Sequence, residues 1–162
     1  MVYISDVNGQ PLMPTNRYGK IRRLLKLNKA KVVRRCPFTI QLLYKTKTNV
    51  IQDITLGVDG GSKHIGFSAS TQAQELYASQ VETRNDIKEL LATRRECRRT
   101  RRNRKTRYRA SRFNNRIKSK HKGWLAPSIE NKIQMHLKEI EFINSILPIK
   151  DIIVESIMPI IV

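Results

Sequence analysis

The chain has 162 residues, of which 40% are hydrophobic, and its 32 basic and 13 acidic side chains give a formal net charge of +19. This length suits one ordinary domain, or a small domain attached to part of a larger one. Two cysteines make neither a disulfide framework nor a zinc site, and no apolar run is long enough to cross a membrane, so disulfide-rich secreted and membrane classes are excluded and a cytoplasmic setting is expected.

Residues 1–50 are predicted to form a small α/β unit. Residues 2–5 are expected to form a strand that is closed by an Asn8-Gly9 turn, and Pro11 and Pro14 impose an extended path on the segment between them. A basic helix is expected over residues 17–27, with Asn28 near its end, followed by strands over residues 30–34 and 38–44. The polar stretch 45–53 marks a boundary to the second region.

The second region is predicted to begin with a β-hairpin over residues 54–70. Gly60 and Gly61 follow Asp59 at the turn, and glycine admits the positive φ that tight turns require. Residues 75–81 are expected to form a third strand. A helix then begins near Asp86, which is one of two candidate caps together with Asn85.

This helix is expected to continue into an arginine-rich segment. Residues 94–122 hold 15 of the 32 basic side chains and one acid, whereas the other 133 residues hold 17 basic and 12 acidic side chains. Such a charge density repels itself unless a polyanion lies against it, so nucleic acid is the expected partner. A disordered basic tail is the simpler alternative. Seven arginines are expected to point in nearly every direction around the helix: Arg94, Arg95, Arg98, Arg99, Arg101, Arg102 and Arg104.

A further amphipathic helix is predicted between a Ser128 cap and Pro148. Residues 151–155 are then expected to form a short apolar strand. The apolar positions of the helix are expected to share one side: Ile129, Ile133, Leu137, Ile140 and Leu147.

Two acids stand at the ends of predicted strands, Asp59 after the first strand of the hairpin and Glu155 at the end of the last strand. If these two strands are adjacent and parallel, both carboxylates meet at one edge of the sheet, where hard oxygen ligands suit Mg²⁺ or Mn²⁺. Two such ions activate water and stabilise the leaving oxygen of a phosphodiester. Each acid also has a simpler interpretation, since Asp-Gly-Gly is a common turn and many strands end in Glu. His64 is expected to be an ordinary surface residue.

Three motifs in this order resemble those of IscB-type proteins, which are transposon-encoded RNA-guided DNA nucleases similar to the type II CRISPR effector nucleases. They are PLMP at residues 11–14, LGVDGGSKHIG at 56–66 and RRTRR at 98–102. The resemblance spans residues 2–155. It implies an α/β fold with a small N-terminal α+β PLMP domain (1–50) and an incomplete RNase H-like, or RuvC-like, fold. In that scheme residues 54–85 are the first RuvC segment, 86–122 an arginine-rich bridge helix and 123–162 the start of a second, truncated segment.

By the same resemblance, Asp59 and Glu155 are implied to be catalytic acids that bind Mg²⁺ or Mn²⁺. Guide RNA and its heteroduplex with target DNA are the implied partners, because this family grips the duplex by its backbone while base pairing reads the sequence. The residues implied to bind RNA are Arg94, Arg95, Arg98, Arg99, Arg101, Arg102, Arg104 and Arg107.

The sequence departs from the family's pattern after Glu155, where it reads SIMPIIV. IscB continues there with an HNH nuclease domain and a third RuvC segment that carries the remaining acid. We therefore expect an N-terminal fragment that binds RNA, does not cut DNA alone, exposes a strand edge and is completed by a missing C-terminal half. Two alternatives are a non-catalytic structural RNA-binding protein and a repressor that binds one transcript of its own transposon.

Overall fold

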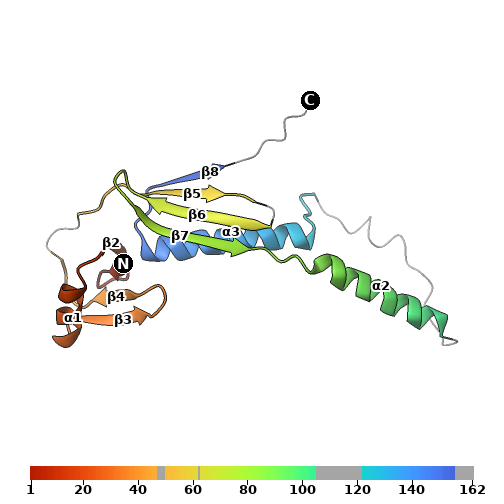
Figure 1. Cartoon of the computed structure of the whole chain (residues 1–162), viewed down its shortest axis with the longest axis horizontal. Coiled ribbons are helices and arrows are strands. Elements are labelled where there is room, and N and C mark those ends of the chain that lie inside the picture. The colour runs from red at the N-terminus through yellow and green to blue at the C-terminus, as the bar shows by residue number, and fades with distance from the viewer. Residues whose placement is uncertain (47–49, 62, 105–121, 156–162) are drawn as a thin grey trace, which may run out of the picture.

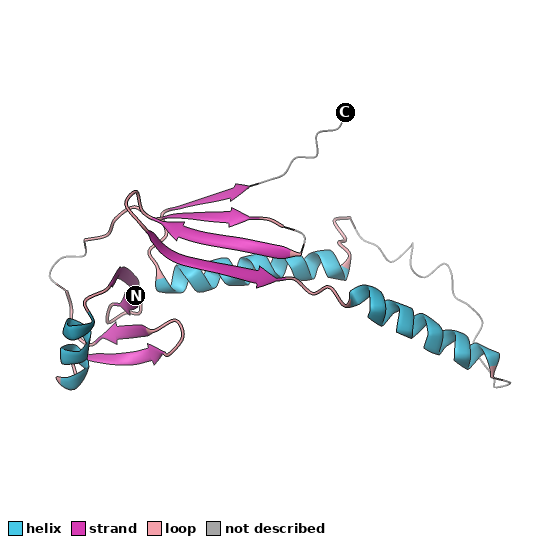
Figure 2. Ribbon diagram, viewed as in Figure 1, coloured by secondary structure: helices cyan, strands magenta, loops and turns pink. Residues whose placement is uncertain are grey.

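The computed structural model describes residues 1–46, 50–61, 63–104 and 122–155. Within these residues the protein has a mixed α/β fold with two four-stranded sheets and three helices (Figure 1). Colouring by secondary structure separates a small sheet with a short helix from a longer sheet with two long helices (Figure 2). None of the described helices is both long and apolar enough to cross a bilayer.

The first sheet has the strand order β2-β1-β4-β3 and lies close to the N-terminus (Figure 1). Its β1–β2 and β3–β4 pairs are antiparallel, whereas β1 and β4 are parallel. Its elements are β1 (Val2–Ser5), β2 (Pro11–Thr15), α1 (Tyr18–Lys26), β3 (Ala30–Arg34) and β4 (Thr39–Leu42). The apolar side of α1 packs against this sheet and forms a small core: Val2, Ile21, Ala30, Ile40 and Leu42.

The local predictions for this part of the chain are confirmed. The proline-containing segment is the extended strand β2. Gly9 has a φ of 85° in the predicted turn, which the Asp6 carboxylate supports by accepting hydrogen bonds from the backbone N–H groups of Asn8 and Gln10. Asn28 has a φ of 53° just beyond α1, a left-handed conformation that ends many helices.

The second sheet has the strand order β7-β6-β5-β8. Its strands are β5 (Thr55–Asp59), β6 (His64–Ser70), β7 (Glu75–Glu82) and β8 (Asp151–Glu155). Helices α2 (Ile87–Asn103) and α3 (Pro127–Ile146) lie between β7 and β8 in the sequence. Antiparallel pairing joins β5, β6 and β7, and the chain then returns through the two helices to place β8 parallel to β5. The predicted hairpin, third strand and parallel last strand are therefore all present.

Alternating residues of the second sheet build its core against α3, which covers one face (Figure 1). Leu56 and Val58 of β5 are buried, as are Ile65 and Phe67 of β6, because side chains on a strand point alternately to its two faces. The opposite face remains open. That face carries the side chain of Asp59, the next residue after Val58.

The two sheets are joined by a contact that the sequence does not reveal. The side chain of Tyr3 leaves β1 and enters the core of the second sheet, where its hydroxyl donates a hydrogen bond of 2.9 Å to the Leu76 carbonyl. Its ring meets the edge of the Tyr77 ring at 6.3 Å between centroids. Nearby, the Arg34 guanidinium lies 4.8 Å from the centroid of the Phe142 ring. Burial raises the pKa of the Tyr3 phenol, because desolvation penalises the phenolate.

One predicted helix cap is confirmed in its position, and the other is wrong. Asp86 does occupy the N-cap position of α2, but its carboxylate makes no capping hydrogen bond and instead pairs with Arg84. Helix α3 begins two residues earlier than expected, with Ala126 as N-cap and Pro127 in its first turn, so Ser128 is already inside the helix. Proline suits this position because its missing N–H would have no partner there.

The apolar side that the sequence predicts for α3 divides between two environments. Two of its members contact the core: Ile140 and Leu147. Three others remain 43–49% exposed: Ile129, Ile133 and Leu137. The helical residues buried most deeply are instead Ile143 and Ile146, whose positions are centred roughly 110° around the helix from the exposed three.

Helix α2 extends away from the second sheet and buries none of its residues (Figure 1). Leu90 and Leu91 are 44% and 51% exposed. Helices without a buried side typically cross solvent between domains or depend on many side-chain pairs within the helix. The expected continuation to residue 122 falls largely in residues 105–121, which lie outside the described part of the chain.

Candidate metal and nucleic-acid sites

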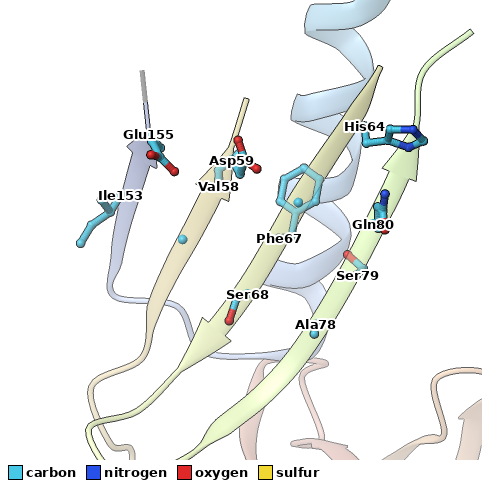
Figure 3. A pocket seen from close by; sticks show the side chains of 12 residues that line it. Val58, Asp59, His64, Phe67, Ser68, Ala78, Ser79, Gln80, Ile153 and Glu155 are labelled. Carbon is cyan, nitrogen blue, oxygen red and sulfur yellow. The ribbon is translucent and has the colours of Figure 1, made fainter. Parts of the chain in front are cut away.

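Two carboxylates meet at one end of the second sheet. Asp59 ends β5 and Glu155 ends β8, and the two residues are direct partners in the parallel register of these strands. Cα partners on neighbouring strands lie roughly 4.8 Å apart, and in register their side chains leave the same face of the sheet. Figure 3 shows both side chains at the same end of the two strands, with the Glu155 carboxylate turned toward Asp59.

The surface around this pair is hollowed and lined by small residues. A hollow of about 870 Å³, open to solvent, extends from the two acids across the exposed face of β5, β6 and β7. Gly66 is the cross-strand partner of Asp59, and a Cβ atom added there would lie 3.5 Å from the Asp59 Cβ and 3.8 Å from its Oδ2. Gly57 and Ala78 also line the hollow with small residues. The Asp59 carboxylate is therefore open to a ligand from the side of β6.

The glycines after Asp59 do not have the role that the sequence suggests. Positive φ among the described glycines is confined to Gly9 and Gly123. Gly61 is required for another reason, because a Cβ atom at this position would overlap the carbonyl oxygen of His64. The predicted hairpin is present. Its Gly61 is required because the backbone approaches closely at His64, and not because the turn is left-handed.

His64 is exposed, as expected of a surface residue, and it lines the hollow from the start of β6. In Figure 3 its ring is turned toward β7, away from the two carboxylates. In the described part of the chain there is no group of three or more His, Cys, Asp or Glu residues that could hold a metal ion. The donors that the structure brings together are therefore the two carboxylates.

A pair of carboxylates fits the chemistry of Mg²⁺ or Mn²⁺. Mg²⁺ is commonly bound through one or two carboxylates, and water and substrate phosphate complete its octahedral shell. Asp59 and Glu155 supply two hard anionic oxygen ligands at an open surface that a phosphate could reach. These two residues would hold the ion.

The arginines of α2 form one face of the helix, so the expectation that they point in nearly every direction is wrong. At about 100° per residue, the six arginines within the helix fall in an arc of roughly 160°. All six are exposed: Arg94, Arg95, Arg98, Arg99, Arg101 and Arg102. Four of them line a surface recess together with Leu91 and Asn103: Arg95, Arg98, Arg99 and Arg102.

The opposite face of α2 carries no cation within the helix. Thr93 and Thr100 lie there and donate hydroxyl hydrogen bonds to carbonyls one turn earlier in the same helix, those of Glu89 and Glu96. The acidic side chains of Glu89 and Glu96 are on the same side of the helix. A polyanion would therefore meet α2 from the arginine face.

The last two predicted RNA-binding residues differ from these six. Arg104 is exposed at the C-cap of α2, where the backbone is already extended, so its direction is not set by the helix. Arg107 lies outside the described residues.

A second concentration of charge was missed because the sequence was divided only into the arginine-rich segment and the remainder. Residues 1–46 contain ten basic residues and a single acid, Asp6. When the chain outside the arginine-rich segment is counted as a whole, the acidic residues in 47–93 and 123–162 offset this positive charge. Counting charge for each structural unit would have revealed it.

Comparison with known proteins gives one family. The model of a family described as RRXRR protein matches residues 2–158, almost the entire chain. None of the curated proteins matches.

Proposed function

Because the chain belongs to the RRXRR family, we propose that it provides the RNA-binding helix and two metal-binding acids of an RNA-guided, IscB-like nuclease. In this proposal α2 is the bridge helix, and the second sheet with α3 is part of a RuvC-like, RNase H-related fold. Guide RNA and its heteroduplex with target DNA are the partners.

The observation that supports this proposal best is the register of β5 and β8. Asp59 and Glu155 are separated by most of the chain, yet they are cross-strand partners at the open end of the sheet. A basic protein that only coats RNA has no need to bring two acids together. Their repulsion is tolerated where a cation neutralises them.

The arginine face of α2 supports the RNA-binding half of the proposal. Guanidinium groups remain charged at any physiological pH and bind phosphate through two N–H donors at once. Along the helix these side chains repeat every three or four residues, roughly 5–6 Å apart on the axis. A row with this spacing can follow successive phosphates without reading bases, as guide-dependent recognition requires.

The metal-binding half of the proposal assigns a role to Asp59 and Glu155. A bound Mg²⁺ or Mn²⁺ would activate water and stabilise the leaving oxygen of a phosphodiester. Asp59 and Glu155 bind and orient the ion, and Gly66 leaves the space over Asp59 that an approaching phosphate needs.

Metal binding tests this half directly. Mn²⁺ binding to the full chain would be measured by electron paramagnetic resonance for Asp59→Asn and Glu155→Gln. Each variant loses one charged ligand, and since the loss of even an outer-shell partner weakens metal binding about tenfold to a hundredfold, binding should weaken at least about tenfold. Asp151→Asn is the matched control, because Asp151 lies at the other end of β8, opposite Thr55. Equal affinities in all three variants would contradict the proposal.

The alternative is a structural RNA-binding protein without catalytic ancestry. It is favoured by the limited donor set of the described chain, which offers two carboxylates and no third metal ligand beside them. Under this alternative RNA binding persists while Asp59→Asn and Glu155→Gln leave Mn²⁺ binding unchanged. The same titration therefore separates the two functions.

A further inference from the structure

The first sheet and α1 carry a cationic surface separate from the arginine face of α2. Residues 1–46 hold ten basic side chains and one acid, a formal charge of +9, and residues 94–122 hold 15 and one. The remaining 87 residues hold seven basic and 11 acidic side chains, a formal charge of −4. The positive charge of this protein is therefore concentrated in two units.

Helix α1 presents its cations outward. Ile21 is buried against the sheet and Leu24 and Leu25 are partly buried beside it, so the apolar side of α1 is already used. The outward side is exposed and basic over two turns: Lys20, Arg22, Arg23 and Lys26. Further exposed cations flank the helix and extend onto β3: Arg17, Lys29, Lys31 and Arg35.

Within the described part of the chain these cations form no ion pair with an acid. Among the described residues the ion pairs are Arg84 with Asp86 and Lys150 with Asp53, and neither involves this surface. Asp6, the single acid of the unit, uses its carboxylate to accept two backbone hydrogen bonds in its own turn. Neighbouring like charges without counter-charges destabilise a small folded unit unless an anionic partner neutralises them.

A cleft beside α1, lined by both apolar and polar residues, indicates the kind of anion. It has a volume of about 790 Å³ and lies between α1, β2 and the residues Tyr44, Thr46, Val50 and Gln52. Arg17 and Lys20 line it, together with Tyr44, Gln52 and Gln74. Cations can bind phosphates there, while the tyrosine ring and the amide groups suit stacking and hydrogen bonding with unpaired bases.

We propose that α1 and this cleft form a second RNA-binding surface, which binds an unpaired part of the RNA held by α2. The proposal rests on the proposed function in so far as both surfaces serve one RNA. A lipid surface is a poorer match, because membrane-binding helices insert their apolar face, and in α1 Ile21 is buried while Leu24 and Leu25 are partly buried against the sheet.

Fluorescence anisotropy of the full chain with a labelled mixed-sequence single-stranded RNA tests this proposal. Arg22→Gln with Arg23→Gln removes two exposed cations, and glutamine preserves helix propensity. Losing two phosphate contacts should reduce the slope of log affinity against log salt by about 1.4 and weaken binding roughly tenfold near 0.1 M salt. Lys138→Glu makes the same change in net charge on the exposed side of α3 and should bind within about twofold of the parent.

Equal losses for the α1 double variant and Lys138→Glu would overturn the proposal, because binding would then follow net charge alone. Arg98→Gln with Arg102→Gln, measured in parallel, reports on α2 separately. If only that variant loses affinity, the second surface is refuted while the proposed function remains. If only the α1 variant loses affinity, the proposed role of α2 fails instead. The proposal is also refuted if the α1 variant keeps its RNA affinity but no longer sediments with phosphatidylserine vesicles.

Discussion

The single arginine face of α2 can be tested without changing the charge of the protein. Exchanging Arg98 with Thr100, and Arg102 with Thr93, moves two guanidinium groups to the opposite side of the helix and leaves the composition and the net charge of +19 unchanged. Residues 98 and 100 are roughly 200° apart around the axis. If RNA lies on the arginine face alone, the exchanged chain loses two phosphate contacts.

The expected size of this loss follows from counterion release. Each phosphate contact contributes about 0.7 to the salt slope on a single strand and about 0.9 on a duplex, so the exchange should lower the slope by roughly 1.4–1.8. Affinity would be measured by fluorescence anisotropy from low to moderate salt. Far-UV circular dichroism should show equal helix content, because the residues exchanged are the same two types. A salt slope equal to that of the parent would refute RNA binding through one face of α2 and would favour contact from all sides of the helix.

Two further predictions concern the framework that holds the site. Gly61→Ala should lower the free energy of unfolding by roughly 1–3 kcal/mol in urea titrations, because its Cβ would overlap the His64 carbonyl oxygen, whereas Gly57→Ala should cost much less. Tyr3→Phe should cost about 1–3 kcal/mol by leaving the Leu76 carbonyl without its 2.9 Å hydrogen bond, and no change would contradict the contribution of that bond. Since burial raises the pKa of Tyr3, the stability from its neutral phenol is present below about pH 10 and lost as pH rises through the folded value. This loss should be smaller in Tyr3→Phe, where Tyr77, whose pKa burial also raises, remains.

Local structure was predictable wherever one or two residues dominate the backbone. The prolines at 11 and 14 specified the extended strand β2, and Asn28 specified the end of α1 through its left-handed conformation. The glycines at 60 and 61 likewise predicted the hairpin between β5 and β6, although neither has the positive φ on which that prediction relied. These features depend on neighbours in the sequence, so sequence reasoning could reach them.

The candidate site was predictable only as a hypothesis. The sequence identifies Asp59 and Glu155 as acids at the ends of two strands, but pairing between those strands depends on the intervening helices and on how α3 packs. The in-register parallel pair is a property of the sheet. Gly66 belongs to the motif at residues 56–66, but its role in keeping the space over Asp59 open is not visible in the sequence because its partner lies on another strand.

The sequence by itself determined the order of the elements and the density of positive charge, since both follow from local backbone preferences and from counting ionisable groups. Tertiary structure alone decided which side of α3 is buried, that Tyr3 joins the two sheets and that two distant acids are neighbours. The physical reason is that the favoured packing is the one that buries the largest total apolar area. That area depends on the sheet and the helix together, and neither segment determines it alone.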